Sequence, residues 1–474
     1  MSSLVPLLEI ITTGVADLKS AEKKNNTLVP DLSAPFHPAS EAFRADPVAA
    51  ESAAKIVAAA TQLVATLSPP VEGLYALAAA GAFKAAALRV CHESNVTEIL
   101  REAGPEGLHA KEIAQKNGLE EKKIARFLRL LASNHIYEEV RPDVFRNNRL
   151  SSLLDSGKSS ADVIANPKTK HDNTKGPGVF LSHHLDEVSH SAAYTWENVS
   201  NPKIGHSYEA NQCPLSTYLG REVSFWEHMA EPGQEFRRKR FDLAMKGVQA
   251  MQPTTAVLDS LDWDKLPKGS TIVDVGGGIG SYMVPLVENF PDLKYVVQDL
   301  PESIENAEAF WGEKDPKAIA DQTVSLEAHS FFEPQPERDV GVFFMKSIIH
   351  DWSDANCKKI LTHLRKAAGK DTKLVLAESI IPYACRMPEE AEADSKDCVP
   401  GSILKQAPAP LLPNSLTAPM VLLADIVMLI GLSGQERTFD HMQELLLGAG
   451  WKVDEVRRPG AARVMYSFYI ASPI

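Results

Sequence analysis

The stretch Asp274-Val-Gly276-Gly277-Gly278-Ile-Gly280-Ser281 decides the fold of this chain. It follows a short apolar run at 271–275, which is typical of a buried strand, and precedes a helical pattern over 282–289. In a doubly wound sheet, a glycine-rich turn between a strand and a helix lets a nucleotide-like ligand come close to the backbone. We therefore predict that Asp274, Gly276, Gly278 and Gly280 contact a cofactor.

The spacing of these glycines excludes two phosphate-binding loops. The dinucleotide fingerprint GxGxxG requires glycine or alanine where this chain has Ser281. A P-loop requires Lys followed by Ser or Thr after the last glycine, and neither follows Gly280. The loop is predicted to hold a cofactor that has no pyrophosphate.

Strand and helix patterns alternate from residue 270 to the end of the chain. Apolar runs predict strands at 295–299, 340–346 and 373–378, and helices at 282–289, 354–368 and 439–449. The last two strand patterns, 451–456 and 464–472, have no helix between them and are expected to pair as a hairpin. The predicted fold class is α/β, a doubly wound and mostly parallel sheet with an antiparallel C-terminal hairpin.

Asp299 ends the second predicted strand, 25 residues after Asp274. A carboxylate at this place can accept hydrogen bonds from both ribose hydroxyls of an adenosine. The alternative is a surface aspartate that starts a turn before Pro301.

His350 lies in Lys346-Ser-Ile-Ile-His350-Asp351-Trp352, directly after a predicted strand. This position puts it at the rim of the sheet, where ligands bind, and a pKa near ~6.5 suits it to take a proton at neutral pH. Glu378, at the tip of the next strand, and Glu436, in Gln-Glu-Arg-Thr, are candidates to orient its ring. The alternative is a purely structural histidine.

The N-terminal third has a different texture. Residues 47–90 are rich in alanine, which suits close helix packing or a dimer face, and residues 92–150 show helix, helix, helix and hairpin, the winged-helix order. DNA binding is one interpretation, and a dimerisation scaffold or lid is the other. A net charge of −13 argues against binding a phosphate backbone.

Residues 151–215 are polar and predicted to be irregular, with His183, His184 and His190 close together but without the spacing of a metal site. Residues 216–250 are helical and aromatic. They form either core or the wall of a pocket for a flat ligand. The candidate pocket residues there are Phe225, Trp226, Met229 and Met245.

Several classes of protein are excluded by what the sequence lacks. The five cysteines form no CxxC pair, so neither a disulfide framework nor a zinc site is expected. No stretch approaches ~18 uncharged apolar residues, and the first residues do not form a signal peptide, so we expect a cytoplasmic protein without a membrane partner. Pro-rich residues 384–420, with an acidic run at 389–394, predict a long and mobile surface insertion.

From about Leu74 onward the chain resembles the plant and fungal small-molecule O-methyltransferases that use S-adenosylmethionine, the caffeate/flavonoid type, and it is most similar to the fungal branch. The motifs that carry this resemblance are the glycine loop, Gln-Asp299-Leu-Pro, Lys346-x-x-x-His350-Asp351-Trp352, Ala-Glu378-Ser and Gln-Glu436-Arg-Thr.

The resemblance implies a role for each of these residues. His350 is the general base that deprotonates a phenolic hydroxyl, Glu378 and Glu436 hold its ring, and Asp351 helps to orient the substrate. The glycine loop and Asp299 bind S-adenosylmethionine, with Lys346 and Trp352 near its adenosine. No metal is expected. The winged helix becomes a dimerisation domain, so a homodimer with no nucleic acid partner is implied.

Three features depart from the family pattern. Ser330 stands where the fungal pattern has Asp near the adenine, and Ser347 stands where plant members often have Trp. The insertion at 384–420 precedes the helix that carries Met428, a further candidate pocket residue, and could act as a lid.

The predicted domains are an extension at 1–45, a helical winged-helix dimerisation domain at 46–215, and a methyltransferase domain at 216–474. Two alternative functions stay open: a winged-helix DNA-binding regulator with a cofactor-sensing domain, and a cofactor-binding homologue that has lost catalysis.

Overall fold

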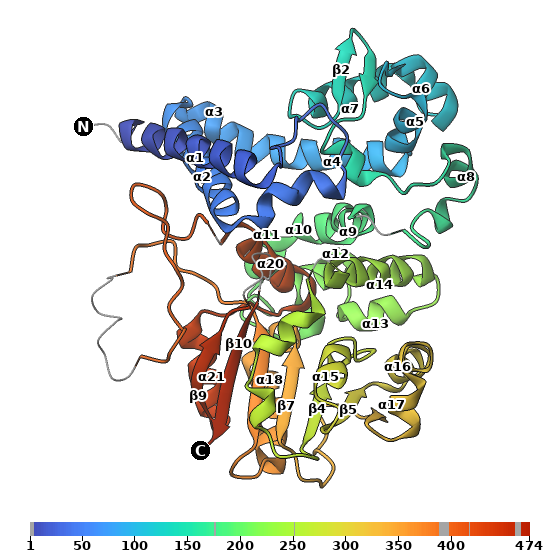
Figure 1. Ribbon diagram of the computed structural model, residues 1–474. Helices are drawn as coiled ribbons and strands as arrows, with labels where there is room; N and C mark the ends of the chain where they lie inside the picture. Colours follow the sequence, from blue (N-terminus) through green and yellow to red (C-terminus); the bar gives the residue numbers. More distant parts are fainter. Residues whose placement is uncertain (1–3, 175–176, 251, 388–397, 417, 460–465) are drawn as a thin grey trace. The chain divides into compact units, whose positions relative to one another are not determined.

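The computed structural model describes the whole chain except residues 1–3, 175–176, 251, 388–397, 417 and 460–465 (Figure 1). Its contacts divide the chain into two units. The first contains Met1–Glu197, Leu215–Met251 and Ala409–Leu411, and the second contains Asn198–Pro214, Gln252–Pro408 and Leu412–Ile474. Leu215–Met251 joins the first unit, although the sequence boundary placed it with the methyltransferase domain, because α14 (Glu235–Ala250) packs along α9 (Gly178–His183).

The first unit begins with two long helices that pack side by side, α1 (Leu4–Asn25) and α2 (Pro47–Leu67). Helix α2 begins where Pro47 follows Asp46, whose carboxylate accepts hydrogen bonds from the first free backbone amides of the helix. The helical run then continues through α3 (Pro70–Tyr75), η2 (Ala76–Ala80) and α4 (Gly81–Glu93).

The predicted winged-helix order is present in the first unit. Its elements are α5 (Val96–Ala103), β1 (Leu108–His109), α6 (Ala110–Asn117), α7 (Glu121–Ala132), β2 (Glu138–Arg141) and β3 (Val144–Arg146). The short strand β1 pairs with β3 and extends the hairpin into a sheet of order β1-β3-β2. The apolar faces of α5, α6 and α7 form one core with Tyr137 and Phe145 from the hairpin.

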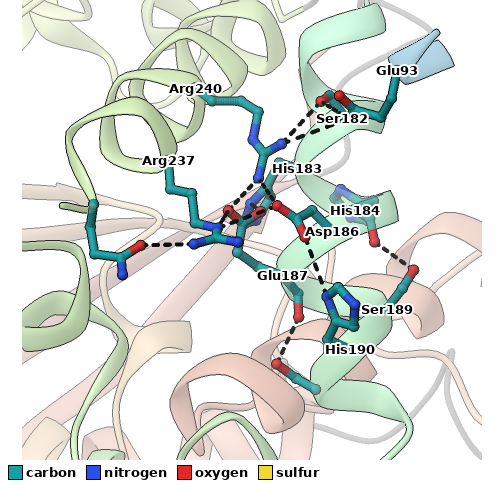
Figure 2. Close-up of polar contacts among 12 residues, drawn as sticks. Glu93, Ser182, His183, His184, Asp186, Glu187, Ser189, His190, Arg237 and Arg240 are labelled. Carbon is teal, nitrogen blue, oxygen red and sulfur yellow. Dashed lines mark hydrogen bonds and ion pairs between the residues drawn. The ribbon is translucent and has the colours of Figure 1, made fainter. Parts of the chain in front are cut away.

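The prediction that residues 151–215 are irregular is wrong, because most of this segment is helical. Its helices are α8 (Ser160–Ala165), α9, η5 (His184–Val188), α10 (Ser189–Ala192), α11 (Thr195–Val199) and the start of α12 (Pro214–Leu219). Buried ion pairs replace apolar periodicity here: Arg240 of α14 reaches between Asp186 and Glu187 of η5 (Figure 2).

The three histidines of this segment are held by hydrogen bonds. Nδ1 of His183 lies 3.0 Å from Glu187, and His190 lies 3.3 Å from Asp186 (Figure 2). Nδ1 of His184 donates to the carbonyl of Phe180. Protein groups therefore satisfy all three imidazole rings.

The second unit is built on a seven-stranded sheet of order β6-β5-β4-β7-β8-β10-β9 (Figure 1). Its strands are β4 (Thr271–Val275), β5 (Lys294–Asp299), β6 (Val324–Ala328), β7 (Val342–Lys346), β8 (Lys373–Glu378), β9 (Trp451–Arg457) and β10 (Ser467–Pro473). The predicted hairpin is confirmed, and β10 inserts antiparallel between β8 and β9. The strand order reverses beside β4, so the glycine loop lies at the point where such sheets bind ligands.

Helices cover both faces of this sheet. One core contains α18 (Asp354–Ala367) and α21 (Phe439–Gly448), and the other contains α15 (Met283–Asn289), α16 (Pro301–Lys314) and α17 (Pro316–Ala320). Alternate residues of the central strands face each core, for example Phe343 and Phe344 of β7. Helix α20 (Ala418–Leu432) precedes the segment that carries Glu436.

Shorter helices complete the description. They are η1 (Pro38–Ala45), η3 (Ser151–Leu154), η4 (Pro167–Thr169), η6 (Ala210–Gln212), α13 (Phe225–Ala230), η7 (Thr254–Asp259), η8 (Trp263–Lys265) and η9 (Ile349–Asp351).

Part of the insertion 384–420 packs against the core of the second unit. The carbonyl of Pro400 accepts a hydrogen bond from the amide of Val456, and Val399 and Leu404 pack against the core. Between Glu378 and Ala418, the described residues form no helix or strand. The predicted acidic run at 389–394 lies outside the described residues.

Two helical stretches of the first unit, Pro47–Leu67 and Pro70–Glu93, are long and apolar enough to cross a membrane, with mean hydropathies of 1.3 and 1.4. This differs from the expectation that no segment would meet such a criterion. Core helices pass the same test, so the finding alone does not define a span.

Candidate active site

His350 lies in the tight turn η9, which follows β7 at the carboxyl edge of the sheet. Its Nδ1 lies 2.8 Å from Oε1 of Glu436, and its Nε2 lies 3.4 Å from Oδ1 of Asp351. Because Glu436 can only accept a hydrogen bond when ionised, Nδ1 carries the proton. Nε2 is therefore the nitrogen that can take a further proton from a ligand.

Glu378 contacts the turn and not the ring of His350. Its Oε1 accepts hydrogen bonds from the amides of Ile348 at 3.0 Å and Ile349 at 2.8 Å. Glu378 thus holds the backbone that leads into His350, and Glu436 is the residue that orients the ring. The family resemblance implies one role for both glutamates, to hold the ring, whereas here only Glu436 contacts it.

The surrounding charges control the proton affinity of His350. Burial alone lowers its pKa, but the carboxylates of Asp351, Glu436 and Glu378 outweigh burial and raise the pKa of His350 to about 10. Burial raises the pKa of Asp351 to about 6 and also raises the pKa of Glu378. The imidazole is therefore a stronger base than a free histidine and is close in pKa to a phenol, near ~10.

The segment that carries Glu436 lies directly against the turn. The amide of Gln435 donates to the carbonyl of His350 at 2.8 Å, and Asp425 of α20 accepts from the amide of Glu436 at 2.9 Å. A Cβ at Gly434 would lie 2.2 Å from the carbonyl oxygen of His350. Glycine is required at this position because the two backbones approach too closely for a side chain.

The glycine loop bends through three residues with positive φ, at 71° for Gly276, 58° for Gly278 and 74° for Gly280. A Cβ at Gly276 would meet Ile348 at 2.7 Å, and one at Gly280 would meet Val297 at 2.6 Å. A Cβ at Gly278 would meet nothing within 4 Å. The outer glycines therefore serve packing within the protein, and Gly278 borders open space that a ligand can use.

Asp299 is joined to the glycine loop. Its Oδ2 accepts a hydrogen bond from the amide of Gly278 at 2.8 Å, and its Oδ1 accepts from the amide of Leu300 at 2.7 Å. Each carboxylate oxygen can accept a second bond, so the pair remains able to receive two ribose hydroxyls. The alternative of a surface aspartate that only starts a turn fits less well, because the carboxylate of Asp299 binds the backbone of the glycine loop.

Asp274 tests the fit of this site to S-adenosylmethionine. Its carboxyl is buried, and it has no hydrogen-bond partner among the residues that the structure describes. Burial, together with Asp299, raises the pKa of Asp274 to about 7, although Lys346 opposes this shift. A buried carboxylate without a partner fits a ligand that brings a positive amino or sulfonium group.

Lys346 lies between two aromatic rings that sequence reasoning missed. Its Nζ is 4.9 Å from the centroid of Tyr282 and 5.5 Å from that of Tyr466, and the two hydroxyls are 3.2 Å apart. Burial lowers the pKa of Lys346. No local signal in the sequence marks Tyr466. It directly precedes β10, and its position near Lys346 depends on the pairing of β10 with β8.

Ser330 and Trp352 occupy one corner of the site. The hydroxyl of Ser330 accepts a hydrogen bond from the amide of Phe332 at 3.3 Å. The ring of Trp352 packs edge to face against Phe332, with centroids 4.8 Å apart, and also contacts Phe331. Together with Trp352, Phe331 and Phe332 form an apolar wall at this corner of the site.

The predicted acceptor-pocket residues are divided between the units. Phe225 and Met229 are buried in the first unit, where Phe225 packs against Phe241 with centroids 4.8 Å apart. Trp226 is 40% exposed, and Met245 is half-buried. Met428 lies on α20 of the second unit. Their role as pocket residues stays a prediction.

The side chains of His350, Glu378 and Glu436 bring their donor atoms within 4.8 Å of one another, a spacing that a divalent ion could use. Metal binding at His350 would require a ring nitrogen that carries no proton, and Nδ1 already contacts Glu436 at 2.8 Å. A protonated His350 would supply a positive charge next to the carboxylates of Glu378 and Glu436.

Comparison with known proteins gives the family. The family model for the O-methyltransferase domain matches residues 206–398. The chain is 45% identical over 458 residues to 4-O-methyltransferase 1 of Phanerochaete chrysosporium, covering 96% of both chains.

Solved structures share the fold. Mitomycin 7-O-methyltransferase MmcR superposes with a TM-score of 0.61 at 22% identity, covering 87% of this chain and 100% of that one. LepI in complex with SAM gives a TM-score of 0.61 at 16% identity, covering 89% and 94%. The chain belongs to the S-adenosylmethionine-dependent O-methyltransferases and to the fungal branch of that family.

Proposed function

We propose that the enzyme transfers a methyl group from S-adenosylmethionine to a phenolic hydroxyl of a small aromatic or polyketide-type acceptor, with His350 as the general base. The observation that carries this proposal is the 2.8 Å contact between Nδ1 of His350 and Glu436, which leaves Nε2 as the proton acceptor. The 45% identity to a protein named 4-O-methyltransferase 1 supports oxygen as the methylated atom.

His350 acts at the acceptor hydroxyl. Nε2 takes the phenolic proton while the oxygen forms a bond to the methyl carbon, and the positive imidazolium that results is stabilised by Glu436. When bound, S-adenosylmethionine supplies the electrophilic methyl group, and its sulfur keeps the electron pair of the broken bond. A positioned base contributes roughly 10²–10⁴-fold, and alignment of the oxygen with the methyl group contributes further.

The cofactor would be held by side chains of the second unit. Asp299 is positioned to accept the ribose hydroxyls, and Gly278 leaves room beside them. Asp274 offers a buried carboxylate to the positive end of the molecule. Phe331, Phe332 and Trp352 form an apolar wall that suits the adenine. Ser330 has no carboxylate, so it cannot bind the adenine as the aspartate of the family pattern would.

The test is a screen of acceptors with methyl-labelled cofactor. We expect labelled methyl ethers of hydroxylated aromatic compounds, and the name of the relative makes a 4-hydroxyl the first position to examine. Mass spectrometry and NMR of the product identify the methylated oxygen. Labelled amines or thiols with no labelled phenol would contradict the proposal.

We also propose that the enzyme is a homodimer in the cytoplasm and that α2 to α4 form the dimer face. Large apolar side chains on these helices are exposed in the first unit. They are Val57 at 65%, Val64 at 65%, Leu67 at 66%, Val71 at 80%, Leu74 at 69%, Tyr75 at 70%, Leu77 at 78% and Phe83 at 60%. An apolar surface of this kind is typical of an interface.

Light scattering after size-exclusion chromatography tests this proposal. We expect a dimer mass for the wild-type chain and a monomer for the double variant Leu74→Glu, Leu77→Glu. A monomeric wild-type protein that co-sediments with lipid vesicles would favour a membrane as the partner of this face and would contradict the dimer.

A further inference from the structure

Arg437, the residue after Glu436, is a buried cation beside the turn that carries His350. Its side chain is 1% exposed. The carbonyl of Arg437 accepts a hydrogen bond from the amide of Ile381, and Arg437 pairs with Ile380 in a parallel bridge just beyond β8. Its backbone is therefore fixed to the same edge of the sheet that ends in Glu378.

The guanidinium group of Arg437 holds the two ends of the His350 turn. Nη1 donates to the carbonyl of Ile349 at 2.9 Å, and Nη2 donates to the carbonyl of Trp352 at 2.9 Å. These carbonyls belong to the residues just before and just after the pair His350-Asp351. The planar fork of an arginine suits this contact because its donors lie in fixed relative positions.

Asp354 neutralises the buried cation. Its Oδ1 accepts from Nε of Arg437 at 3.0 Å and from Nη2 at 2.8 Å. His441 of α21 contacts Oδ2 at 2.8 Å, and Gln435 donates to Oδ1 at 2.9 Å. Because the pair is satisfied on all sides, the guanidinium is held in one orientation.

Glu436 and Arg437 therefore divide one task between them. Glu436 fixes the ring of His350 through Nδ1, and Arg437 fixes the backbone on which that ring is mounted. We propose that Arg437, paired with Asp354, is a positioning residue for His350, an inference that rests on the proposed role of His350 as the base. Arg437 does not reach the reacting atoms and acts through the geometry of the turn.

Arg437→Lys isolates this role because it keeps the positive charge and removes the fork. A lysine ammonium can donate to one carbonyl or to Asp354, but it cannot span both ends of the turn. A displacement of the base by about 1 Å costs roughly 10²-fold in rate. The matched control is Arg365→Lys, since Arg365 also donates to backbone carbonyls, those of Gly450 and Ile474.

The experiment measures kcat, KM for a phenolic acceptor, the Kd for S-adenosylmethionine and thermal stability for Arg437→Lys, Arg365→Lys and Asp354→Asn. We expect kcat of Arg437→Lys to fall by about 10–100-fold with the cofactor Kd within about twofold of wild type. Asp354→Asn keeps an acceptor oxygen for Arg437, so its loss of kcat should be smaller than that of Arg437→Lys. It serves as a second test of the pair if Arg437→Lys folds poorly. Arg365→Lys should keep the wild-type kcat.

A double-mutant cycle with His350→Ala separates positioning from general stability. If Arg437 acts through His350, Arg437→Lys will not lower the residual rate of His350→Ala any further. The inference is overturned if Arg437→Lys reduces both backgrounds by the same factor, or if it leaves kcat unchanged. A wild-type rate for His350→Ala would instead remove the proposed function and this inference with it.

Discussion

Oε1 of Glu436 lies 2.8 Å from Nδ1 of His350, although the two residues are 86 positions apart in the chain. This contact fixes which nitrogen of the imidazole faces an acceptor, and it adds a negative charge that helps to raise the pKa of His350 to about 10. A base of this strength is protonated at neutral pH. The rate of methyl transfer should therefore rise with pH.

Glu436→Gln should shift the pH dependence of methyl transfer. Removal of the charge lowers the pKa of His350 from about 10, so the rising limb of kcat/KM shifts to lower pH. The plateau should fall because an amide no longer stabilises the imidazolium. Measurements of kcat/KM from about pH 6 to about pH 10 check this expectation. The exposed Glu444→Gln serves as the control, and an unshifted limb in Glu436→Gln would contradict the assignment.

Asp299 should govern cofactor affinity. Asp299→Ala removes the acceptor of the Gly278 amide and the proposed acceptor of the ribose hydroxyls, so the Kd for S-adenosylmethionine should rise by about 10–100-fold. Asp299→Asn keeps one oxygen and should weaken binding less. Calorimetric titration gives both values. Asp292→Asn, at an aspartate that is 64% exposed, should bind normally, and equal affinity in all three variants would rule out this role.

Gly434→Ala should impair catalysis without impairing cofactor binding. The added Cβ would lie 2.2 Å from the carbonyl oxygen of His350, so the turn must move. We expect kcat to fall by about 10-fold or more while the cofactor Kd stays unchanged. Gly431→Ala is the matched control, because a Cβ there meets nothing within 4 Å. A normal kcat for Gly434→Ala would show that the contact is not needed.

Arg240→Ala should destabilise the first unit. Arg240 is 3% exposed and pairs with Asp186 at 2.5 Å and with Glu187, so its removal takes the most buried cation from both carboxylates. Arg89 still contacts Asp186, and His183 still contacts Glu187, so we expect a cost of about 2–3 kcal/mol. Scanning calorimetry measures the loss. Arg237→Ala touches the same carboxylates from a position that is 39% exposed and should cost about 1 kcal/mol or less.

The pH dependence of this loss has a defined sign. Burial raises the pKa of Asp186, but the hydrogen bond and charge of Arg240 and the charges of Arg89 and Arg237 outweigh burial and lower that pKa overall. Burial also raises the pKa of Glu187, but the hydrogen bond of His183 and the charges of Arg240 and His183 lower it overall. The stabilisation is therefore present above the ordinary carboxyl pKa near ~4 and is lost as the pH falls through the lowered values. Equal destabilisation by Arg240→Ala at low and at neutral pH would contradict this account.

The sheet could be predicted because its signals are local. Short apolar runs and the turn at Gly276–Gly280 mark β4, β5, β7 and β8 within a few residues of their observed bounds. The helices α9 to α11 could not be predicted from the sequence. They are stabilised by ion pairs such as Asp186–Arg240, which join residues 54 positions apart, and their sequence shows no helical spacing of apolar residues. The order β8-β10-β9 was also hidden, since it depends on which strand edge remains open.

The candidate site shows the same division. His350 and Asp299 stand out because their residue types suit their chemistry and because they lie at or after the ends of strands. Glu436 stands out through its motif Gln-Glu-Arg-Thr. The role of Arg437 could not be seen in the sequence, because its partners are backbone carbonyls, which are present at every position of a chain. Tyr282, Phe331 and Phe332 are ordinary core residues until their packing around Lys346 and Trp352 is seen.

The most direct test of His350 as the base compares His350→Ala with wild type on two acceptors, an ordinary phenol with a pKa near ~10 and a more acidic phenol that is already ionised at the assay pH. Single-turnover methyl transfer is measured with saturating labelled cofactor. The account predicts a loss of roughly 10²–10⁴-fold on the ordinary phenol and a much smaller loss on the acidic one, because that acceptor needs no base. Equal losses on both acceptors, or no loss on the ordinary phenol, would contradict it.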